Sequence, residues 1–370
     1  MEQWPRVRIA LVVTGGVDRS GGEKVIPALL WLLQRLATQH DVFVYALRYH
    51  EQPCTYPLLG ATVRDLGRPA GVLRQYRRLL AALKRDGPFD IVHGYWALPA
   101  GLVAAAAARR LGIPSVVTCD SGEFTAIPEI DYGLQVRWRQ RTAVSAALKI
   151  ATRVTVCTAY MERLARAHGA APVVIPIGVD MAAFPPAPPR ADGPPWRLLN
   201  VANLNPVKDH RTLMEAFRLV ADRVPDVHLD LAGEDTMNGV VQEQVARRAL
   251  SNQVTFHGVL PSDAVAALFR QAHLFVLSSR HEAAGVAALE AAASCAPIAG
   301  TQVGYLADWT PDRARTVSPA DAPALADAII SLLADTTARQ RLASSARQWT
   351  VAHDADWTAS EFARLYRDLV

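Results

Sequence analysis

Short apolar runs alternate with amphipathic segments along almost the whole of this 370-residue chain. Residues 8–13 form the first such run, and leucines then recur at helical spacing across residues 23–39. Apolar runs that lack alternating polar residues are typical of strands buried on both faces, which are joined by helical crossovers. The chain therefore predicts α/β architecture with parallel sheets covered by helices on both faces. Strands are expected at residues 8–13, 41–47, 89–93, 115–118, 153–158, 173–176, 197–201, 228–232, 254–257, 274–277 and 297–300.

A proline-rich stretch interrupts this alternation once. Residues 184–195 contain six prolines, so they can form neither a helix nor a central strand and are interpreted as a stiff linker. A chain of this length also exceeds what one ordinary core accommodates. We therefore expect an N-terminal domain at residues 1–183, a linker at 184–195, a second domain at 196–352 and a C-terminal helix at 353–370.

Composition narrows the class of protein. Hydrophobic residues make up 51% of the chain and charged residues 20%, as in soluble globular proteins. Apolar runs are shorter than the roughly 18–20 residues of a membrane span, and the N-terminus lacks the form of a signal peptide. The four cysteines show neither metal-ligand nor disulfide spacing, which favours the reducing cytoplasm.

Charge is distributed unevenly. Residues 1–183 carry 22 Lys and Arg against 14 Asp and Glu, whereas the remaining residues carry 17 against 21. The basic excess fits peripheral contact with an anionic membrane or an acidic acceptor, but it also fits a solvated helix face. Nucleic acid is not expected, because no aromatic residues are interleaved with the basic ones.

The segment of residues 278–290 has the strongest chemical signature. A buried strand leads into a turn with His281 and Glu282, and an alanine-rich helix follows. A helix N-terminus in this position suits a phosphate, and Glu282 and Glu290 could accept hydrogen bonds from hydroxyl groups. The spacing of the two glutamates alone fits a capped, solvated helix equally well.

Four other places could carry chemistry. Gly21 and Gly22, between the first strand and helix, would let the backbone approach a phosphate, or they form a plain turn. Lys208 could neutralise a diphosphate, and His93 ends a strand where it could act catalytically or merely cap. Asp120, Glu123 and Tyr95 lie near strand ends where open α/β sheets bind ligands, although the two acidic residues could instead form a turn.

Taken together, these motifs resemble the family 4 glycosyltransferases, retaining enzymes of the GT-B type. The resemblance covers nearly the whole chain. It is carried by Gly21-Gly22, residues 90–93, residues 175–180, Pro206-x-Lys208-Asp209, residues 254–258 and residues 278–290. It implies two Rossmann-like domains whose parallel sheets face each other across a cleft, and a last helix that crosses back to the first domain.

The resemblance also implies roles for individual residues. Glu282 would face the donor sugar, Glu290 the ribose, and Lys208 the leaving diphosphate. The remaining donor-side residues would be the phosphate-binding amides at Gly285 and Val286, together with His281, Asn203, Gly21 and Gly22.

Two positions depart from the family pattern. Asn203 stands where an Arg is usual, so the diphosphate has one cation fewer. Thr118-Cys119-Asp120 stands where the family commonly has a His-Gly pair, so Asp120 or a neighbour would replace that His as a catalytic residue. Glu123 and Tyr95 would contact the acceptor.

With this resemblance, the sequence predicts a cytoplasmic glycosyltransferase, either free or peripheral at the inner face of the membrane, that uses a UDP- or GDP-linked sugar. The acceptor would be a sugar, a lipid or a small molecule. The resemblance implies retention of configuration and no required cofactor or metal. Asp354-Ala355-Asp356 has the form of a metal-binding motif but precedes the last helix, where it is interpreted as a cap. Alternatives are a nucleotide-sugar-binding protein without catalysis, a GT-B nucleotide-sugar epimerase and a phosphorylase.

Overall fold

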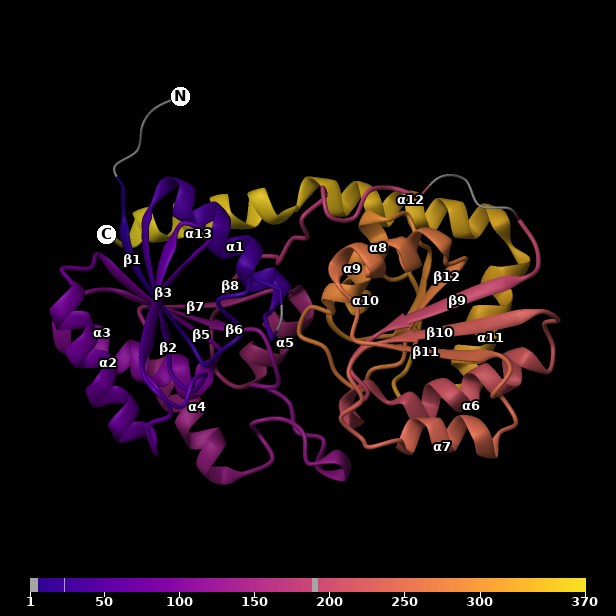
Figure 1. The fold of residues 1–370 in the computed structure, drawn as a ribbon, viewed down its shortest axis with the longest axis horizontal. Coiled ribbons are helices and arrows are strands. Elements are labelled where there is room, and N and C mark those ends of the chain that lie inside the picture. Colours follow the sequence, from indigo (N-terminus) through magenta and orange to yellow (C-terminus); the bar gives the residue numbers. More distant parts are fainter. Residues whose placement is uncertain (1–5, 23, 188–191) are drawn as a thin grey trace. The chain divides into compact units, whose positions relative to one another are not determined.

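The computed structural model describes residues 6–22, 24–187 and 192–370, and the chain divides into two compact units. Unit 1 comprises the residues up to Gly178 together with Ala355–Val370, and unit 2 is Val179–Asp354. Each unit is a largely parallel sheet with helices on both faces (Figure 1), as the alternating pattern predicts.

The sheet of unit 1 has eight strands in the order β3-β4-β2-β1-β5-β6-β7-β8. All neighbours pair in parallel except β3 and β4, which form an antiparallel hairpin at one edge. The strands are β1 (Arg8–Val13), β2 (Asp41–Ala46), β3 (Cys54–Leu58), β4 (Ala61–Asp65), β5 (Ile91–Tyr95), β6 (Ser115–Cys119), β7 (Arg153–Val156) and β8 (Val173–Val174).

Alternate residues of β1 face two different helix layers. Ile9 and Leu11 belong to a core shared with the first and last helices, whereas Ala10 and Val12 belong to a core shared with α2 and α3. Both α2 and α4 pack against α3. The helices are α1 (Pro27–Gln39), α2 (Val72–Asp86), α3 (Leu102–Leu111), α4 (Trp138–Ile150), α5 (Ala159–Ala167) and α13 (Ala355–Leu369), with short turns at Ala97–Gly101 and Pro128–Ile130.

Unit 2 has a six-stranded parallel sheet in the order β11-β10-β9-β12-β13-β14. Leu274 and Val276 of β12 face the core under α6 and α11, whereas Phe275 contacts Phe269 of α8 on the other face. The strands are β9 (Trp196–Val201), β10 (Val227–Ala232), β11 (Val254–Gly258), β12 (Leu274–Leu277), β13 (Ile298–Thr301) and β14 (Arg315–Val317). The helices are α6 (His210–Ala221), α7 (Val240–Arg247), α8 (Ser262–Gln271), α9 (Val286–Ala293), α10 (Gly304–Trp309), α11 (Ala322–Ala334) and α12 (Thr336–Ala352), with a short turn at Pro206–Lys208.

The boundaries between the units differ from those expected from the proline-rich stretch. The chain enters unit 2 at Val179, because Phe184 is buried there against Phe269, with ring centroids 6.1 Å apart. Ala187 donates its backbone N–H to the Ser294 carbonyl. Of the expected linker, residues 188–191 lie outside the described residues.

Strand order reverses at one place in each sheet. The reversal falls between β1 and β5 in unit 1 and between β9 and β12 in unit 2. Open α/β sheets bind ligands beyond the carboxyl ends of the strands at such points. The loops that follow these four strands are therefore where a site is sought.

Candidate functional site

The loop after β12 leads directly into the helix α9. Gly285 occupies the N-cap position with φ +84°, a left-handed conformation that suits glycine, and no side chain among the described residues caps the first turn of this helix. The first backbone N–H groups of α9 consequently point out of the helix at its positive end. This arrangement can hold an anion.

Glu282 in the same loop meets Lys208 from the loop after β9. The Lys208 Nζ lies 2.6 Å from the Glu282 Oε1, and the Ser279 hydroxyl donates to the same oxygen, also at 2.6 Å. The Lys208 side chain is 25% exposed and that of Glu282 is 11% exposed. The two loops at the strand-order reversal of unit 2 thus bring together an ammonium and a carboxylate 74 positions apart in sequence.

Backbone contacts fix the Lys208 loop against the Glu282 loop. Ser278 donates its hydroxyl to the Lys208 carbonyl at 2.7 Å, and the Arg280 N–H donates to the Val207 carbonyl at 2.7 Å. Asn205 accepts from the Lys208 N–H through its side chain. The ammonium therefore extends from a braced turn, which favours preorganisation.

Glu290 lies in the second turn of α9 and is 9% exposed. Burial raises the pKa of its carboxyl to about 8, so the acid is largely protonated at neutral pH. A buried carboxyl that still reaches solvent is suited to a ligand hydroxyl, to which it can donate or from which it can accept.

The other expected donor-side residues are placed as follows. His281 is almost completely buried, with 1% exposed. Asn203 is exposed at the same end of the sheet, and its Oδ1 accepts from the Glu234 N–H at 3.1 Å. Val286 is the first residue of α9. Unit 2 therefore gathers Lys208, Glu282, Gly285, Val286 and Glu290 around two adjacent strand ends.

In unit 1, the glycine loop follows β1. Gly21 has φ +65°, and a Cβ added to Gly22 would meet nothing within 4 Å, so the backbone there is open to approach. Glu23, next in the chain, lies outside the described residues.

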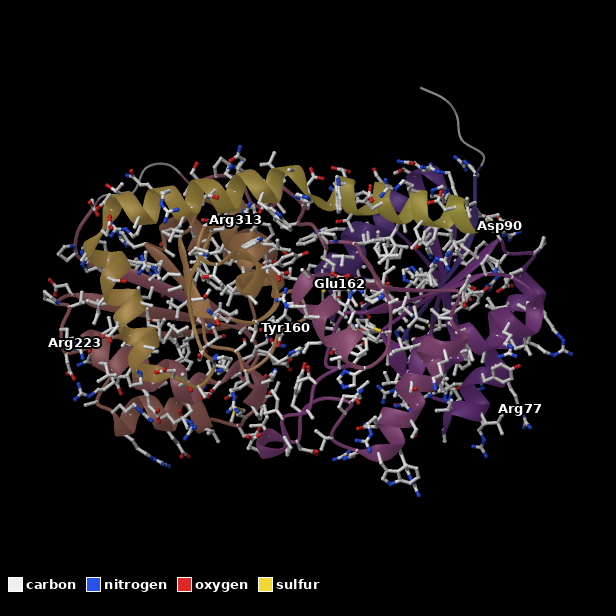
Figure 2. All side chains as sticks on the ribbon, turned by 180° about the vertical axis from the view of Figure 1, so that it is seen from behind. Arg77, Asp90, Tyr160, Glu162, Arg223 and Arg313 are labelled. Carbon is white, nitrogen blue, oxygen red and sulfur yellow. The ribbon has the colours of Figure 1, made fainter. Side chains whose placement is uncertain are left out.

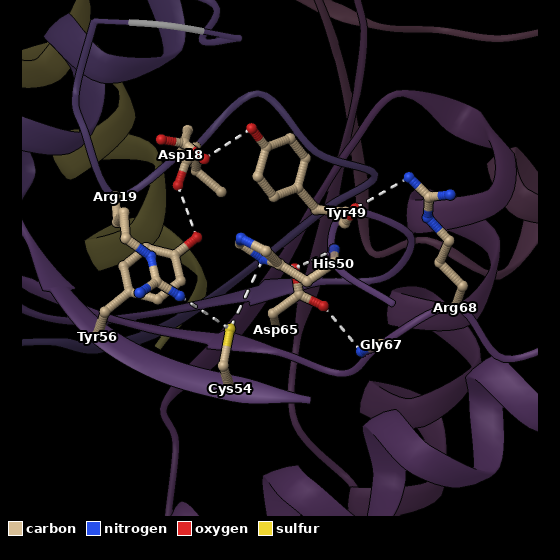
Figure 3. Close-up of polar contacts among 10 residues, drawn as sticks. Asp18, Arg19, Tyr49, His50, Cys54, Tyr56, Asp65, Gly67 and Arg68 are labelled. Carbon is tan, nitrogen blue, oxygen red and sulfur yellow. Dashed lines mark hydrogen bonds and ion pairs between the residues drawn. The ribbon is translucent and has the colours of Figure 1, made fainter. Parts of the chain in front are cut away.

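A polar cluster supports this glycine loop (Figure 3). Asp18 accepts from the Tyr49 hydroxyl at 2.8 Å and from the Ser20 N–H at 2.9 Å. The Tyr56 hydroxyl donates to the Val17 carbonyl at 2.8 Å. Chiefly because of the Ser20 N–H, the pKa of the Asp18 carboxyl is lowered. These contacts thus hold the loop in place, and Gly22 stays exposed.

His93 lies in the interior of unit 1 and has no exposed surface. Its Nδ1 lies 2.6 Å from the Tyr366 hydroxyl and its Nε2 lies 2.7 Å from the Thr118 hydroxyl. Burial lowers the pKa of the imidazole to about 3, which keeps the ring neutral. These contacts are those of a core residue that joins β5, β6 and α13, and a substrate cannot reach the ring in this structure.

Tyr95, Asp120 and Glu123 lie in three different environments. Tyr95 is 2% exposed and packs its ring beside those of His93 and Trp96. Asp120 is partly exposed and accepts from the Cys157 thiol at 3.3 Å. Glu123 is fully buried, and burial raises its pKa, although its oxygens accept from the backbone N–H groups of Ala97 and Ser121.

Sequence patterns missed residues that support the site. Ser279 binds Glu282, and Thr301 donates to the Ser279 carbonyl at 2.6 Å. Single hydroxyls of this kind leave no recognisable spacing. Within the described part of the chain, no three His, Cys, Asp or Glu side chains are arranged to hold a metal ion, and no helix is long and apolar enough to cross a membrane.

Two family models match the chain in succession. Residues 23–178 match a glycosyl transferase 4-like domain, and residues 186–349 match glycosyl transferases group 1. A putative glycosyltransferase, EpsF of Bacillus subtilis (strain 168), is 27% identical over 317 residues, which is 78% of this chain and 77% of that protein.

Solved structures share the fold over nearly the full length. Sucrose-phosphate synthase from Thermosynechococcus elongatus superposes with a TM-score of 0.81 at 20% identity, covering 98% of this chain and 99% of that one. HepE from Anabaena, solved in complex with UDP-glucose, gives a TM-score of 0.77 at 17% identity, covering 98% of this chain and 100% of that one.

Proposed function

Because the chain belongs to the group 1 glycosyltransferases, with a glycosyl transferase 4-like domain in its first half, we propose that it moves a sugar from a nucleoside-diphosphate sugar to an acceptor hydroxyl. The observation that carries this proposal is the Lys208–Glu282 pair beside the uncapped N-terminus of α9. It supplies a cation, a carboxylate and an anion-binding helix end at the place where α/β sheets bind ligands.

In this proposal the diphosphate of the donor sits on the first N–H groups of α9, at Gly285 and Val286. Lys208 neutralises the charge that develops as the diphosphate leaves, and Glu290 binds the ribose hydroxyls. The donor is a UDP-linked sugar, as the UDP-glucose complex of HepE suggests, with a GDP-linked sugar as the second possibility.

The proposed reaction retains anomeric configuration. The bond from the anomeric carbon to the diphosphate oxygen breaks while a bond to the acceptor oxygen forms on the same face. The hydroxyl proton of the acceptor ends on the released nucleoside diphosphate. Glu282 faces the sugar, and preorganised charge at Lys208 and α9 is the main catalytic contribution. Since these groups carry the charge, turnover should not require a divalent metal and should survive EDTA.

Substitution at the pair tests the proposal. Lys208→Ala and Glu282→Ala should each lower turnover about a hundredfold or more, by the scale of a lost electrostatic contact in the transition state. The measurement is transfer of radiolabelled sugar, with the donor first selected by thermal shift among UDP-, GDP-, ADP- and dTDP-sugars. Lys149→Ala and Glu243→Ala, at exposed positions, are matched controls.

Each rival function predicts a different result. Transfer at the normal rate by both variants of the pair would refute the proposed chemistry. Donor binding without transfer to any acceptor would identify a binding protein. Conversion of the donor in the absence of an acceptor would identify an epimerase.

We further propose that the protein works in the cytoplasm at an anionic membrane surface, through α2, α3 and α4, here called the basic helix layer. These three helices carry ten Lys and Arg side chains against one Asp. Arg77 lies on the outer side of α2 (Figure 2). Two large apolar side chains accompany the charges, since Leu73 is 60% and Trp138 is 64% exposed. Basic residues with an exposed tryptophan are typical of surfaces that bind membranes.

A further inference from the structure

Unit 1 contains a cavity of about 310 Å³ at its own strand-order reversal. Thr14 follows β1, Trp96 and Leu98 follow β5, and Ser121 follows β6, so three loops at the carboxyl ends of adjacent strands line it. Its volume is at the lower end of the roughly 300–1,000 Å³ of small-molecule sites. We call it the Trp96 cavity.

The backbone of Trp96 is unusual. Its φ is +69° and its ψ is 141°, a combination that side chains rarely adopt and that costs on the order of 1–3 kcal/mol. Two backbone hydrogen bonds hold it, from the Trp96 N–H to the Thr118 carbonyl and from the Gly101 N–H to the Trp96 carbonyl, both at 2.8 Å. The fold therefore maintains a strained residue in the cavity lining.

A tightly folded loop supplies Tyr132, the second aromatic residue of the lining. Tyr132 pairs with Ile127, and the Leu134 N–H donates to the Gly122 carbonyl at 2.8 Å. A Cβ at Gly133 would lie 1.9 Å from the Thr125 carbonyl oxygen, so only glycine fits there. Tyr132 is consequently held in place before any ligand arrives. A lining that contains two aromatic residues together with the hydroxyl-bearing Thr14 and Ser121 suits the apolar faces and hydroxyl edges of a carbohydrate ring.

The charges around the cavity argue against a phosphate. Among the described residues that line it, none is Lys, Arg or His. The backbone N–H of Ala97, at the start of the helical segment after β5, would otherwise attract an anion, but it donates to Glu123 at 3.2 Å. The second oxygen of this carboxyl accepts from the Ser121 N–H at 2.7 Å. The protein thus fills its own anion site with a carboxyl group.

We propose that the Trp96 cavity holds the acceptor, and that the part of the acceptor seated there is an uncharged, hydroxyl-bearing ring such as a sugar or cyclitol without a phosphate. This inference rests on the proposed glycosyl transfer and adds the substrate class to it. Trp96 and Tyr132 are the residues that grip the ring, and Glu123 excludes anionic analogues.

Matched neutral and phosphorylated probes test this inference. The pairs are glucose with glucose 6-phosphate, myo-inositol with inositol 3-phosphate, and N-acetylglucosamine with its 1-phosphate. Binding is followed by saturation-transfer NMR on the full chain in saturating UDP. A neutral probe should give ring-proton signals at least tenfold stronger than those of its phosphorylated partner.

Trp96→Gly is the informative variant, because glycine adopts a positive φ without strain and the backbone is preserved. It should reduce the neutral probe's signal at least fivefold, as should Tyr132→Ala, whereas Val259→Ala, at a position that is 74% exposed, should not. Preference for a phosphorylated probe, or neutral signals that do not depend on Trp96, would overturn the inference.

Two further measurements separate this result from the proposed function. UDP binding to the same samples, measured by calorimetry, depends on unit 2. If the wild-type chain binds UDP but no neutral probe gives a Trp96-dependent signal, only the cavity assignment is wrong. If none of UDP, GDP, ADP and dTDP binds, the proposed function itself is contradicted.

In addition, Leu98→Lys should shift preference towards the phosphorylated member of each pair, because it adds a positive charge to the cavity lining.

Discussion

Glu290 and His93 are both buried ionisable side chains, yet burial moves their pKa values in opposite directions. Loss of solvent disfavours the charged form of each, so the pKa of the carboxyl rises to about 8 and that of the imidazole falls to about 3. Both groups are therefore neutral in the folded chain near pH 6. The free energy of unfolding should therefore fall as pH decreases, because the imidazole of His93 is protonated more readily in the unfolded chain. It should also fall as pH increases, because the Glu290 carboxyl ionises more readily in the unfolded chain.

Glu290→Gln should remove the loss of stability at alkaline pH. Between the ordinary carboxyl value of about 4.5 and the folded value of about 8, the unfolded chain has released a proton that the folded chain retains. Rising pH therefore favours unfolding, and each pKa unit corresponds to about 1.4 kcal/mol.

The measurement is urea unfolding of both proteins from pH 5 to pH 8.5. The wild type should lose stability relative to Glu290→Gln as pH rises. Parallel curves would contradict the buried, protonated acid. Glu243→Gln, at a largely exposed position, is the control.

Among the residues singled out from the sequence, those on loops after strongly apolar strands lie together in the structure. Lys208 and Glu282 meet because β9 and β12 are neighbours at the strand-order reversal, which a parallel α/β pattern already implies. Trp96 was not predicted as a site residue, because its strained φ depends on the loops that surround it. His93 carries the same strand-end signature as a ligand-binding residue, but α13 returns to cover it.

At the scale of elements, the sequence predicts those strands and helices that have a long, uninterrupted hydrophobic pattern. The central strands of both sheets lie where their apolar runs predict, and α1 spans Pro27–Gln39 within the segment 23–39 where leucines recur at helical spacing. The edge hairpin of β3 and β4 was missed, because Pro57 and alternating polar residues obscure its pattern. Its turn, with positive φ at Leu59 and Gly60, becomes legible only once the strands are paired.

The basic helix layer yields a prediction at this scale. The full chain should sediment with vesicles that contain a third phosphatidylglycerol and not with pure phosphatidylcholine, and 0.5 M salt should release it, because screening shortens the reach of surface charge. Arg74→Glu combined with Arg77→Glu should abolish binding, and Trp138→Ala should weaken it.

A charge reversal on another helix of the same unit provides the comparison. Arg163→Glu and Arg166→Glu on α5 should leave vesicle binding intact. Equal loss in both double variants would show that net charge, rather than this layer, drives association. Binding of the wild type to neutral vesicles would contradict the electrostatic argument.

For the whole molecule, each of the two units has its own core, so we expect that one unit can be destabilised without destabilising the other. Phe362 of α13 is buried in unit 1, and Phe269 of α8 is buried in unit 2. Truncating either ring to alanine removes about 3–5 kcal/mol from the core that contains it. Hydrogen exchange should therefore rise in β1 and β5 for Phe362→Ala, and in β9 and β12 for Phe269→Ala.

Each variant serves as the control for the other. UDP should still bind Phe362→Ala, since Lys208, Glu290 and the N-terminus of α9, which are proposed to hold it, lie in unit 2. Exchange that rises throughout the chain in both variants would indicate a single cooperative unit instead.

The last helix has a consequence for how such proteins can diversify. Unit 1 is completed only when α13, at the very end of the chain, packs beside α1 and bonds His93 through Tyr366. A single genetic crossover near residue 178 would therefore graft a foreign first half onto a mismatched final helix. Exchange of acceptor specificity between relatives needs two junctions, at 178/179 and 354/355, or compensating changes where α13 meets its new neighbours. Recombination between such genes should accordingly keep residues 1–178 together with residues 355–370, rather than exchange the first half of the chain alone.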